Sequence, residues 1–489
     1  MFLTGTARVV FSVILAASAA ATGAAAADDS LRSRLTPRWW ESAAGLKVVT
    51  LKQGRSYAAE VLSLDPAKAG LQLDRIKAQG FQVIEIFAPA EGLFAYAGLD
   101  TKNHYRIDPE LGTMDDFRNL VRLAHSKGIA VVIFHNVGYH SVEAPDWLEA
   151  CDLKKAGKTE GKVKWFIWAD RADAPAPTPE DTYFVVVGRA LQRPPTWGWQ
   201  FSERAGSFYW SRWEARLKDG SRVGLPADDW RSEEWPQEAG RILRAWMDTG
   251  LDGVIVDAPV CYPGLDWQNV NRFITGVISK TPNVIIQPEG GRGVGWITEG
   301  GFNCMQDYSV RFDQAIASGD PRPIEESLRY HDAVVAVGSV LYKKEFAAYD
   351  DPAKTHLAKA TVAALGEIVA FIWRRGTASP DPDEEETWIL KTKFAHPALH
   401  NLGWRTKLET NADDKYYAFL RTSADKSERI VVALNFQPSP QTVEVDLSGI
   451  AAERLVDVRT GESLQRRSFV KVELPAYGYR FFQVIPEKR

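Results

Sequence analysis

Two acidic residues each stand at the end of an apolar segment, about one helix-length apart along the chain. Asp257 follows the segment 253–256 and the turn 250–253, whose sequence is Gly-Leu-Asp-Gly. Glu289 follows the largely apolar segment 283–288. In a parallel barrel, neighbouring strands end at the same open face, where catalytic groups lie. The pair therefore suits cleavage of a glycosidic bond, in which one carboxylate attacks as nucleophile and one protonated acid gives its proton to the leaving oxygen.

Neither acid is specific by itself, because an acid at a strand end can also cap that strand or bind a helix of the barrel. The spacing of the two favours chemistry, since consecutive strand ends of a barrel bring their side chains to one face. Retaining glycosidases hold their two carboxyl groups about 5 to 5.5 Å apart, which neighbouring strand ends provide. We therefore interpret Asp257 and Glu289 as a catalytic pair.

The segments around this pair alternate between apolar strands and amphipathic helices. Strands that are apolar on both faces are typical of parallel sheets covered by helices. The repeated strand–helix order favours an α/β fold, a closed (β/α)8 TIM barrel, over an open sheet. The predicted strands are 81–87, 129–134, 250–257, 283–289, 339–346 and 368–373, and the predicted helices are 114–127, 236–249, 269–279 and 354–365.

Two regions interrupt the alternation and predict additional domains. Between the third strand and the next helix, about a hundred residues rich in tryptophan are too many for a loop and predict an inserted subdomain on the active face. Near the C-terminus, short segments alternate in polarity, which is typical of an antiparallel β-sandwich. The predicted organisation is a signal peptide over 1–27, barrel segments over 28–135 and 233–402, the inserted subdomain over 136–232 and the C-terminal β-sandwich over 403–489.

The N-terminus carries the features of a secretory signal peptide. Arg8 precedes the apolar stretch 9–21, and small residues continue to Ala27, where cleavage is expected. The mature protein is therefore expected to be secreted or periplasmic. No later segment has about 18 uninterrupted apolar residues, so no membrane span is expected.

The composition excludes several classes of protein. With 489 residues, 45% hydrophobic and 25% charged, the chain is long enough for more than one domain with a sizeable core. The formal net charge of -4 offers no basic surface for nucleic acid. The cysteines, Cys151, Cys261 and Cys304, are odd in number and cannot all pair internally. Cys261 lies close to Asp257, but no Cys-His spacing supports a thiol nucleophile, so a packed thiol is expected.

Four short segments carry a family resemblance. They are 98–117, 225–230 (Leu-Pro-Ala-Asp-Asp-Trp), 250–257 and 396–399 (His-Pro-Ala-Leu), and they occur in this order before the predicted sandwich. From about residue 37 to the C-terminus, the chain resembles the alpha-amylase family, glycoside hydrolase family 13. The resemblance implies a retaining glycoside hydrolase acting on an α-glucosidic oligo- or polysaccharide. A transglycosylase using the same covalent intermediate, and a carbohydrate-binding relative without turnover, stay open as alternatives.

The resemblance implies a role for three carboxylates. Asp257 matches the family's nucleophile and Glu289 its general acid and base. The third carboxylate, which grips sugar hydroxyls, follows the seventh strand, and Asp351 is the best match because a helix begins directly after it. Asp350, one residue away, and Asp332, which keeps a His-Asp pair, are alternatives. Asp351 could also be only the N-cap of that helix.

Five positions depart from the family pattern. Where relatives have an aspartate, an asparagine and a histidine around the third strand, this chain has Phe134, Gly138 and Tyr139. The arginine two residues before the nucleophile is Ile255, and the stacking tyrosine after the second strand is Leu99. These groups normally hold the sugar ring at the point of cleavage, so the resemblance leaves the sugar and its linkage open.

The loss of the family's arginine leaves the nucleophile in need of another donor to stay ionised. The candidates for that donor are His135, Asn136, His140 and Arg292, although both histidines could instead be packed or surface residues. The expected substrate-binding residues are Asp100, His135, Asn136, Tyr139, His140 and Arg292.

No cofactor or metal is expected. The sequence has no His-Glu-x-x-His spacing for zinc. Relatives that bind calcium use the asparagine that is Gly138 here, so the resemblance implies an altered calcium site, and a different oxygen cage stays open. The glycine-rich run 290–295 lacks the order of a dinucleotide site. The expected partner is an oligosaccharide or polysaccharide substrate, and the sequence does not indicate an oligomeric state.

Overall fold

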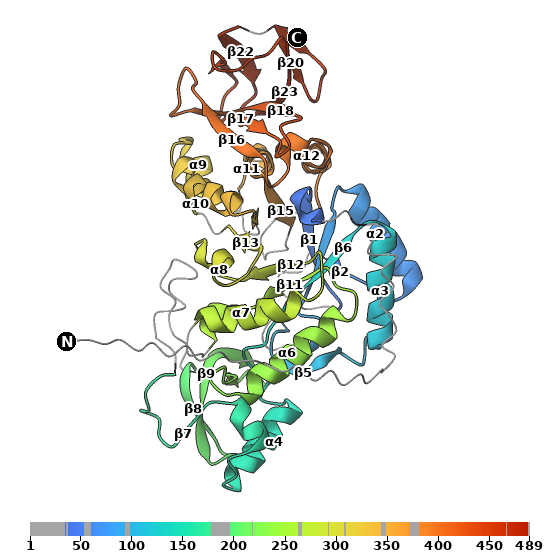
Figure 1. Ribbon diagram of the computed structural model, residues 1–489, viewed down its shortest axis with the longest axis vertical. Coiled ribbons are helices and arrows are strands. Elements are labelled where there is room, and N and C mark those ends of the chain that lie inside the picture. The colour runs from blue at the N-terminus through green and yellow to red at the C-terminus, as the bar shows by residue number, and fades with distance from the viewer. Residues whose placement is uncertain are drawn as a thin grey trace, which may run out of the picture.

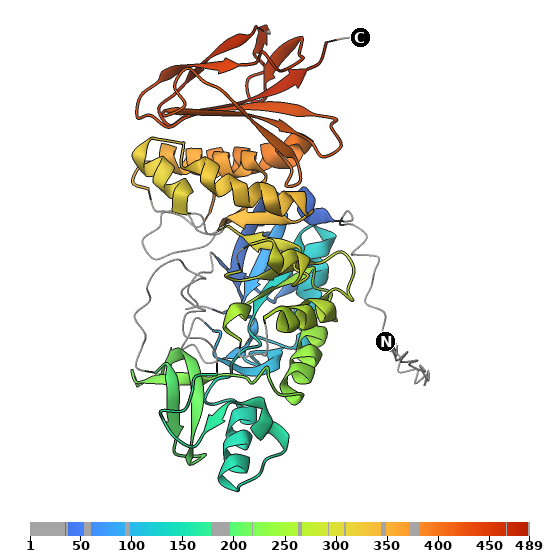
Figure 2. The ribbon, with the colours of Figure 1, turned by 60° about the vertical axis from the view of Figure 1, so that its left-hand side comes forward.

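The structure, a computed structural model, has three parts arranged in a row (Figures 1 and 2). The C-terminal sheet domain lies at one end, the barrel in the middle and the inserted subdomain at the other end. The predicted signal peptide lies outside the described residues. The structure describes residues 35, 38–52, 60–92, 98–177, 196–217, 219–262, 267–291, 293–307, 310–343, 349–371, 381–465 and 467–487.

Parallel strands form a nearly closed barrel, which confirms the predicted fold class. The barrel strands are β1 (Gly45–Thr50), β3 (Val83–Phe87), β6 (Ala130–His135), β11 (Gly253–Val256), β12 (Ile285–Pro288), β13 (Cys304–Gln306), β14 (Val340–Lys343) and β15 (Glu367–Phe371). Their hydrogen-bonded order is β12-β11-β6-β3-β1-β15-β14-β13, and β2 (Glu60–Val61) pairs with β1 outside this path. The helices of this part are α2 (Pro66–Ala78), α3 (Met114–Ser126), α6 (Glu234–Met247), α7 (Trp267–Ile278), α8 (Gly295–Thr298), α9 (Val310–Ser318), α10 (Ile324–Ala336), α11 (Pro352–Leu365) and α12 (Glu384–Ala395).

Alternate residues of the barrel strands point into the barrel and out to the helices. Ile255 of β11 and Ile285 of β12 pack in the interior cluster of apolar side chains. Val256 packs in the other cluster, which also contains the apolar side chains of the surrounding helices. Because side chains alternate with a period of two along a strand, Asp257 and Glu289 continue the inward series.

One seam of the barrel is closed by an asparagine side chain. β12 and β13 are the two ends of the hydrogen-bonded path. Through its side chain, Asn303 accepts from the Ile286 N–H (2.8 Å) and donates to the Val284 carbonyl (2.8 Å). Its own backbone N–H donates to the Ile286 carbonyl (3.1 Å). A polar side chain thus supplies the pairing beside the strand that carries Glu289.

The turn before β11 explains the Gly-x-Asp-Gly sequence. Gly250 has a φ of 97°, a left-handed conformation that favours glycine. A Cβ at Gly253 would lie 2.3 Å from the carbonyl oxygen of Ile285, so no larger residue fits. The Asp252 carboxylate accepts from a backbone N–H of β6 (2.8 Å) and bonds His125 Nε2 of α3 (2.6 Å). This aspartate is therefore structural, since it ties β11 to its neighbours.

The inserted subdomain has a core of aromatic side chains. Trp147 stacks on Trp168 with ring centroids 5.0 Å apart, and it packs edge-on against Phe166 (4.9 Å) and Tyr209 (4.8 Å). Large aromatic side chains bury enough area to hold a small subdomain together. The elements of this subdomain are α4 (Pro145–Lys155), β7 (Trp168–Ala169), β8 (Gly198–Ser202), β9 (Ser207–Arg216) and β10 (Arg222–Pro226).

Two antiparallel sheets form the C-terminal domain. Its strands are β16 (Trp404–Leu408), β17 (Tyr416–Thr422), β18 (Arg429–Asn435), β19 (Gln441–Asp446), β20 (Arg454–Asp457), β21 (Ser463–Gln465), β22 (Phe469–Leu474) and β23 (Tyr479–Ile485). One sheet has the order β16-β17-β18-β23-β20-β21, and the other is the pair β19-β22. Val431 and Phe482 from the first sheet share a core with Val443 and Val472 from the second. Apolar side chains therefore alternate inward in both sheets, as the sequence predicts.

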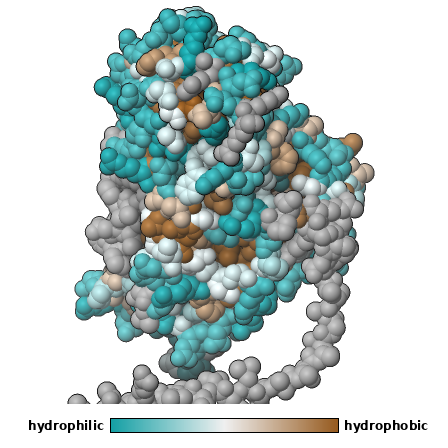
Figure 3. Space-filling model, turned by 45° about the horizontal axis from the view of Figure 1, so that its top comes forward, coloured by the Kyte–Doolittle hydropathy of each residue, from teal (hydrophilic) through white to brown (hydrophobic). Residues whose placement is uncertain are grey.

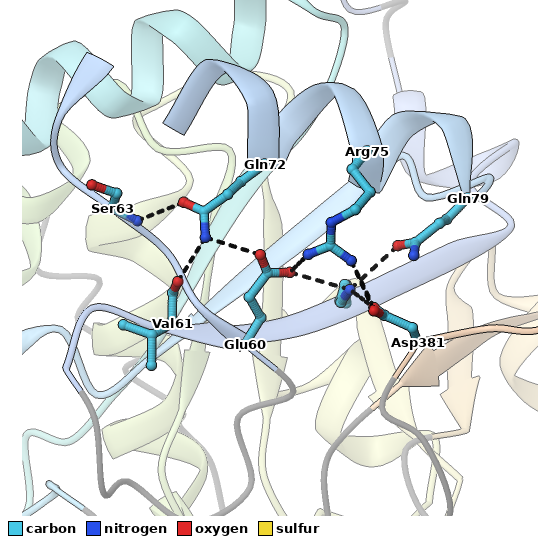
Figure 4. A network of polar contacts seen from close by, with 8 residues as sticks. Glu60, Val61, Ser63, Gln72, Arg75, Gln79 and Asp381 are labelled. Atoms are coloured by element: carbon cyan, nitrogen blue, oxygen red, sulfur yellow. Dashed lines mark hydrogen bonds and ion pairs between the residues drawn. The ribbon is translucent and has the colours of Figure 1, made fainter. Parts of the chain in front are cut away.

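A network of four charged groups joins the first and last units of the barrel (Figure 4). The Arg75 guanidinium of α2 lies 2.5 Å from Glu60 of β2 and 2.9 Å from Asp381, which precedes α12. Lys47 of β1 has a fully buried side chain and bonds the same two carboxylates at 3.2 and 2.5 Å. Charges shared within a network stabilise more than isolated surface pairs. The network holds Asp381, directly in front of the described start of α12, against α2.

The face of the molecule shown in Figure 3 is mostly hydrophilic, with apolar side chains gathered near its middle. The most exposed large apolar side chains lie on different elements and include Leu71 on α2, Trp404 on β16 and Phe469 on β22. Within the described ranges, no helix has the length and apolar character to cross a bilayer. All three cysteines are buried and form no disulfide.

Candidate active site

Asp257 and Glu289 follow the carboxyl ends of two hydrogen-bonded neighbours, β11 and β12. The strands pair in parallel with Val256 opposite Pro288, and the Glu289 N–H donates to the Val256 carbonyl (2.8 Å). Neighbouring strands lie about 4.8 Å apart, and both side chains follow the inward series of their strands. This placement suits the separation of about 5 to 5.5 Å that retaining glycosidases use between their carboxyl groups.

The backbone beside the nucleophile position is strained. Asp257 is 4% exposed, and Glu289 is half-buried. Ala258, directly after Asp257, has a φ of 36°, and Ala88, directly after β3, has a φ of 46°. A left-handed alanine is unfavourable by about 1 to 2 kcal/mol, and such strain concentrates at functional sites. Two strand ends on the open face of the barrel therefore carry the backbone signature of an active site.

Tyr139 contacts the nucleophile position directly. Its hydroxyl donates a hydrogen bond of 2.5 Å to Oδ2 of Asp257, and both side chains are buried. The structure places Tyr139, an expected substrate-binding residue, on Asp257, and its contact with a substrate stays a prediction. It stands where the family has a histidine, while the arginine position, Ile255, packs in the barrel interior. The sequence marks this position only as a departure from the family's histidine and does not indicate the contact with Asp257.

The side chain of Asn136 forms hydrogen bonds that hold the turn that carries Tyr139. Its Oδ1 accepts from the N–H groups of Gly138 (2.7 Å) and Tyr139 (3.2 Å). Its Nδ2 donates to the carbonyls of Tyr139 (2.7 Å) and Leu99 (3.2 Å). An amide side chain has no further donors, so Asn136 shapes the loop and is not the donor to Asp257.

His135 and His140 are packed outside the barrel interior, which corrects the expectation that they donate to the nucleophile or bind substrate. His135 is the last residue of β6 and continues its outward series, with its ring 5.5 Å from that of Trp246 on α6. His140 Nδ1 bonds Asp228 Oδ1 at 2.7 Å, and its ring lies 5.1 Å from that of Trp235. Both imidazoles are 1% exposed, so both are packed histidines, which is the alternative that the sequence left open.

His104, which the sequence analysis did not single out, completes a cluster of buried histidines. Its ring lies 5.6 Å from His135 and 4.5 Å from His140. Burial lowers the pKa of His135 to about 3. Burial and the two neighbouring imidazoles lower the pKa of His104 well below its usual value. Burial raises the pKa of Asp228 to about 6, against the opposing effect of His140. His104 and His135 are therefore neutral at neutral pH.

This histidine cluster is expected to make the fold less stable as the pH is lowered. Below a pKa of about 6.5, the unfolded chain protonates His104 and His135 whereas the folded protein keeps them neutral, so each removes up to about 1.4 kcal/mol of unfolding free energy per pH unit. Asp228 has the opposite sign, because the folded state protonates it between about pH 6 and 4 and thereby offsets one histidine. Urea unfolding at a series of pH values between 7 and 4 measures the slope.

His135→Phe is the matched variant for this prediction, because it keeps an aromatic ring and removes one site of protonation. Its unfolding free energy is expected to depend on pH less steeply than that of the wild type, by one proton between about pH 6 and 4. Equal slopes in both proteins would rule out the contribution of His135.

Asp100 lies in a hairpin beside the site. The hairpin consists of β4 (Ala90–Gly92) and β5 (Thr101–Ile107), and Asp100 is fully buried directly before β5. Leu99, in place of the family's stacking tyrosine, packs in the interior cluster. Contact between Asp100 and a substrate therefore stays a proposal. Arg292, the remaining expected substrate ligand, lies outside the described residues.

The three candidates for the third carboxylate lie in different places. Asp351 is the exposed N-cap of α11, and its side chain accepts from the Ala353 N–H (2.9 Å). Asp350 is exposed beside it, and both follow β14, the seventh barrel strand. Asp332 lies on α10, where it bonds Arg405 of the C-terminal domain (3.0 Å). Asp332 is therefore not at a strand end, and Asp351 combines a helix cap with the expected position.

The residues at the family's calcium position do not fit that ion. A Cβ added to Gly138 would lie 2.1 Å from Cε1 of Tyr262, so the asparagine of calcium-binding relatives has no space there. The nearby Asp228 carboxylate bonds an imidazole nitrogen of His140 instead. In the part of the chain that the structure describes, no group of three or more histidine, cysteine, aspartate or glutamate side chains is arranged to hold a metal.

Two protein-family models match the chain. The alpha amylase catalytic domain matches residues 71–275, and the maltogenic amylase C-terminal domain matches residues 407–481. The first match includes Asp257 and ends before Glu289, and the second covers most of the C-terminal sheets.

Curated relatives match part of the chain. It is 27% identical over 260 residues to Probable oligo-1,6-glucosidase 2 of Bacillus subtilis (strain 168), which covers 53% of this chain and 41% of that protein. It is 28% identical over 184 residues to the trehalose synthase of Thermus thermophilus, which covers 37% of this chain and 16% of that protein. The matched part thus spans less than half the length of either relative.

Solved structures share the fold over nearly the whole chain. The trehalose-6-phosphate hydrolase of Bacillus licheniformis superposes with a TM-score of 0.66 and 15% identity, covering 92% of this chain and 100% of that one. An identity this low shows a common fold and leaves the reaction to be argued from the site.

Proposed function

Because the chain belongs to the alpha-amylase family of glycoside hydrolases, we propose that it is an enzyme that cleaves an α-glucosidic bond in an oligo- or polysaccharide with retention of configuration. The observation that carries this proposal is the placement of Asp257 and Glu289 at adjacent, hydrogen-bonded strand ends, both facing inward. The apolar stretch 9–21 after Arg8 supports secretion or a periplasmic location.

In the first step, the ionised Asp257 attacks the anomeric carbon while Glu289 gives its proton to the glycosidic oxygen, so that the carbon–oxygen bond breaks and a glycosyl ester forms on Asp257. In the second step, the ionised Glu289 takes a proton from water, and the water oxygen attacks the anomeric carbon and releases the carboxylate. Two displacements from opposite faces restore the original configuration.

Asp351 is proposed as the third carboxylate, which binds sugar hydroxyls. Its support is its position after the seventh barrel strand, at the same end of the barrel as the catalytic pair. Asp100 and, outside the described residues, Arg292 are proposed as further contacts to the sugar.

Transfer to a sugar hydroxyl instead of water is a second candidate function. It uses the same covalent intermediate, and a trehalose synthase is among the relatives. A carbohydrate-binding protein without turnover is a third candidate. It is motivated by the apolar residues Phe134 and Ile255, which pack in the barrel interior at positions where the family resemblance implies charged groups.

The test is the configuration of the first product. Wild-type protein is incubated with a panel of α- and β-linked oligosaccharides, and the product anomer is followed by NMR before mutarotation. An α-linked substrate is expected to give the α product, because retention needs the covalent step. The variant Glu289→Gln, purified in the same way, controls for contaminating glycosidases. A β product would contradict the retaining mechanism, and inactivity over the panel combined with measurable sugar binding would favour the non-catalytic candidate.

A further inference from the structure

We propose that Tyr139 is the positioning residue that orients Asp257 and keeps it ionised, in place of the arginine that relatives use. The inference rests on the proposed function, because it assigns Asp257 the role of nucleophile. It starts from one contact: the Tyr139 hydroxyl donates to Asp257 Oδ2 over 2.5 Å. Tyr139 is 1% exposed and Asp257 is 4% exposed, so water does not compete strongly for this bond.

The side chains that pack next to Asp257 in the barrel interior are apolar. Ile255 lies two residues before Asp257, on the same face of β11, and packs in the barrel interior. Phe134 packs there too, stacked on Phe87 with ring centroids 4.8 Å apart and an interplanar angle of 29°. A carboxylate that packs next to buried apolar side chains is disfavoured in its charged form unless hydrogen bonds stabilise it.

The turn around Tyr139 fixes the direction of its hydroxyl. Asn136 bonds the backbone N–H and carbonyl of Tyr139 at 3.2 and 2.7 Å. The backbone of Tyr139 also forms an antiparallel bridge with Ala227 of the inserted subdomain. The ring lies 6.1 Å from that of Trp213, on β9 of the same subdomain. The donor is thus held in place before any substrate arrives, which is the arrangement that makes a hydrogen bond effective in catalysis. The inserted subdomain therefore contacts the side chain that bonds the nucleophile.

A neutral donor affects the two displacements differently. During the first displacement, Asp257 loses its charge as it forms the ester, so the bond from Tyr139 weakens. During the second, the leaving carboxylate regains its charge, so the bond strengthens and favours release. Removing the hydroxyl should therefore slow the second displacement more than the first. The glycosyl enzyme should accumulate, which lowers kcat and KM together.

The experiment compares Tyr139→Phe with Tyr209→Phe. Tyr209 is also buried, but its hydroxyl donates to the Gly224 carbonyl (2.9 Å) within the inserted subdomain, so this variant controls for the loss of a buried phenol. With an aryl α-glycoside, Tyr139→Phe is expected to lower kcat about 10- to 100-fold, as one hydrogen bond to a charged group allows. KM is expected to fall as well, a burst of released phenol is expected to appear, and the acid limb of the pH–rate profile is expected to move to higher pH.

Tyr209→Phe should keep the wild-type kcat, KM and acid limb. Unchanged kinetics in Tyr139→Phe would overturn the inference, and so would equal changes in both variants. A fall in kcat with no change in KM and no shift of the acid limb would point to a structural role only, and would overturn it as well.

A measurement without turnover separates this inference from the proposed function. In protein labelled with ¹³C at tyrosine Cζ, the Tyr139 resonance is identified by its loss in Tyr139→Phe. Asp257→Asn should shift this resonance, because the acceptor changes from a carboxylate to an amide, and should leave the Tyr209 resonance in place. If the resonance shifts in a protein without turnover, the contact stands and the hydrolase proposal fails. If the protein turns over and the resonance does not shift, the positioning role fails alone.

Discussion

Asp257→Ala is expected to lower kcat by about 10⁴-fold or more while the substrate still binds, because the covalent route loses its nucleophile. Glu289→Gln is expected to lower kcat by about 10²- to 10⁴-fold on oligosaccharides, the contribution of one positioned acid or base. On a 4-nitrophenyl glycoside the first step should be less affected in Glu289→Gln, since that leaving group departs without a proton. Steady-state kinetics on both substrate types, with sugar affinity measured separately, test these expectations.

Added azide distinguishes the roles of the two acids. In Asp257→Ala, azide attacks the substrate directly in a single displacement, so the glycosyl azide should have the inverted configuration. In Glu289→Gln, azide attacks the ester on Asp257, so the glycosyl azide should have the retained configuration. The opposite pattern would exchange the two assignments. If both variants keep wild-type turnover, neither acid is catalytic.

Asp351→Asn makes the same change of carboxylate to amide outside the pair. Asparagine caps a helix about as well as aspartate, so α11 should keep its stability while a third carboxylate would be lost. We expect turnover to fall at least tenfold with an unchanged melting temperature, and Asp350→Asn serves as the neighbouring control. Full activity of Asp351→Asn would leave Asp351 with its capping role alone.

Gly138→Asn, which restores the residue of calcium-binding relatives, is expected to destabilise the protein by about 3 kcal/mol or more, at or beyond the upper end of the usual effect of overpacking. A Cβ at this position would lie 2.1 Å from the ring of Tyr262. That ring cannot swing away easily, because it stacks on Trp230 with an interplanar angle of 8° and its hydroxyl bonds the Val137 N–H. Urea unfolding gives the size of the effect, and added calcium should not restore stability.

Gly276→Ala is the matched glycine variant. Gly276 lies within α7 and is exposed, and a Cβ there would meet nothing within 4 Å. Alanine in the interior of a helix is more favourable than glycine by about 0.5 to 1 kcal/mol, so this variant should be more stable than the wild type. Wild-type stability of Gly138→Asn would contradict the close packing of Tyr262 against Gly138.

The barrel could be predicted because most of its strands are continuous apolar segments of the sequence. The apolar segments 81–87 and 129–134 correspond to β3 and β6, and each is followed by a helix or a long insertion. The sixth barrel strand could not be predicted in this way. β13 has only three residues, and much of its link to β12 comes from the side chain of Asn303. A strand that short has no periodicity to read, and side-chain pairing leaves no pattern in the sequence.

The two strand-end acids could be placed from the sequence, because the end of an apolar run marks the end of a strand. The direction of His135 could have been read as well. Val131 and Ile133 pack outside the barrel, and His135 has the same parity. The apolar run ends at Phe134, one residue before the strand does, so the run alone does not show that His135 belongs to β6.

The role of Tyr139 had no such signal. Its position depends on the turn that Asn136 organises and on the bridge to Ala227, far away in the sequence. Bonds between a side chain and the backbone of a loop follow no period, and contacts with an inserted subdomain depend on tertiary packing. For the same reason the histidine cluster, with members on β5, β6 and the following loop, could only be found in three dimensions.

The link that Asn303 makes between β12 and β13 determines where the barrel can open without separating the two catalytic acids. A ladder of backbone bonds joins β11 to β12, whereas on the other side of β12 the described bonds to the strand's backbone come from Asn303. Thermal fluctuations should therefore open the barrel first between β12 and β13, since fewer bonds must break there. Glu289 and Asp257 follow the two strands that this ladder joins, so they would move together. The barrel can therefore open at the seam while the distance between the two acids is preserved.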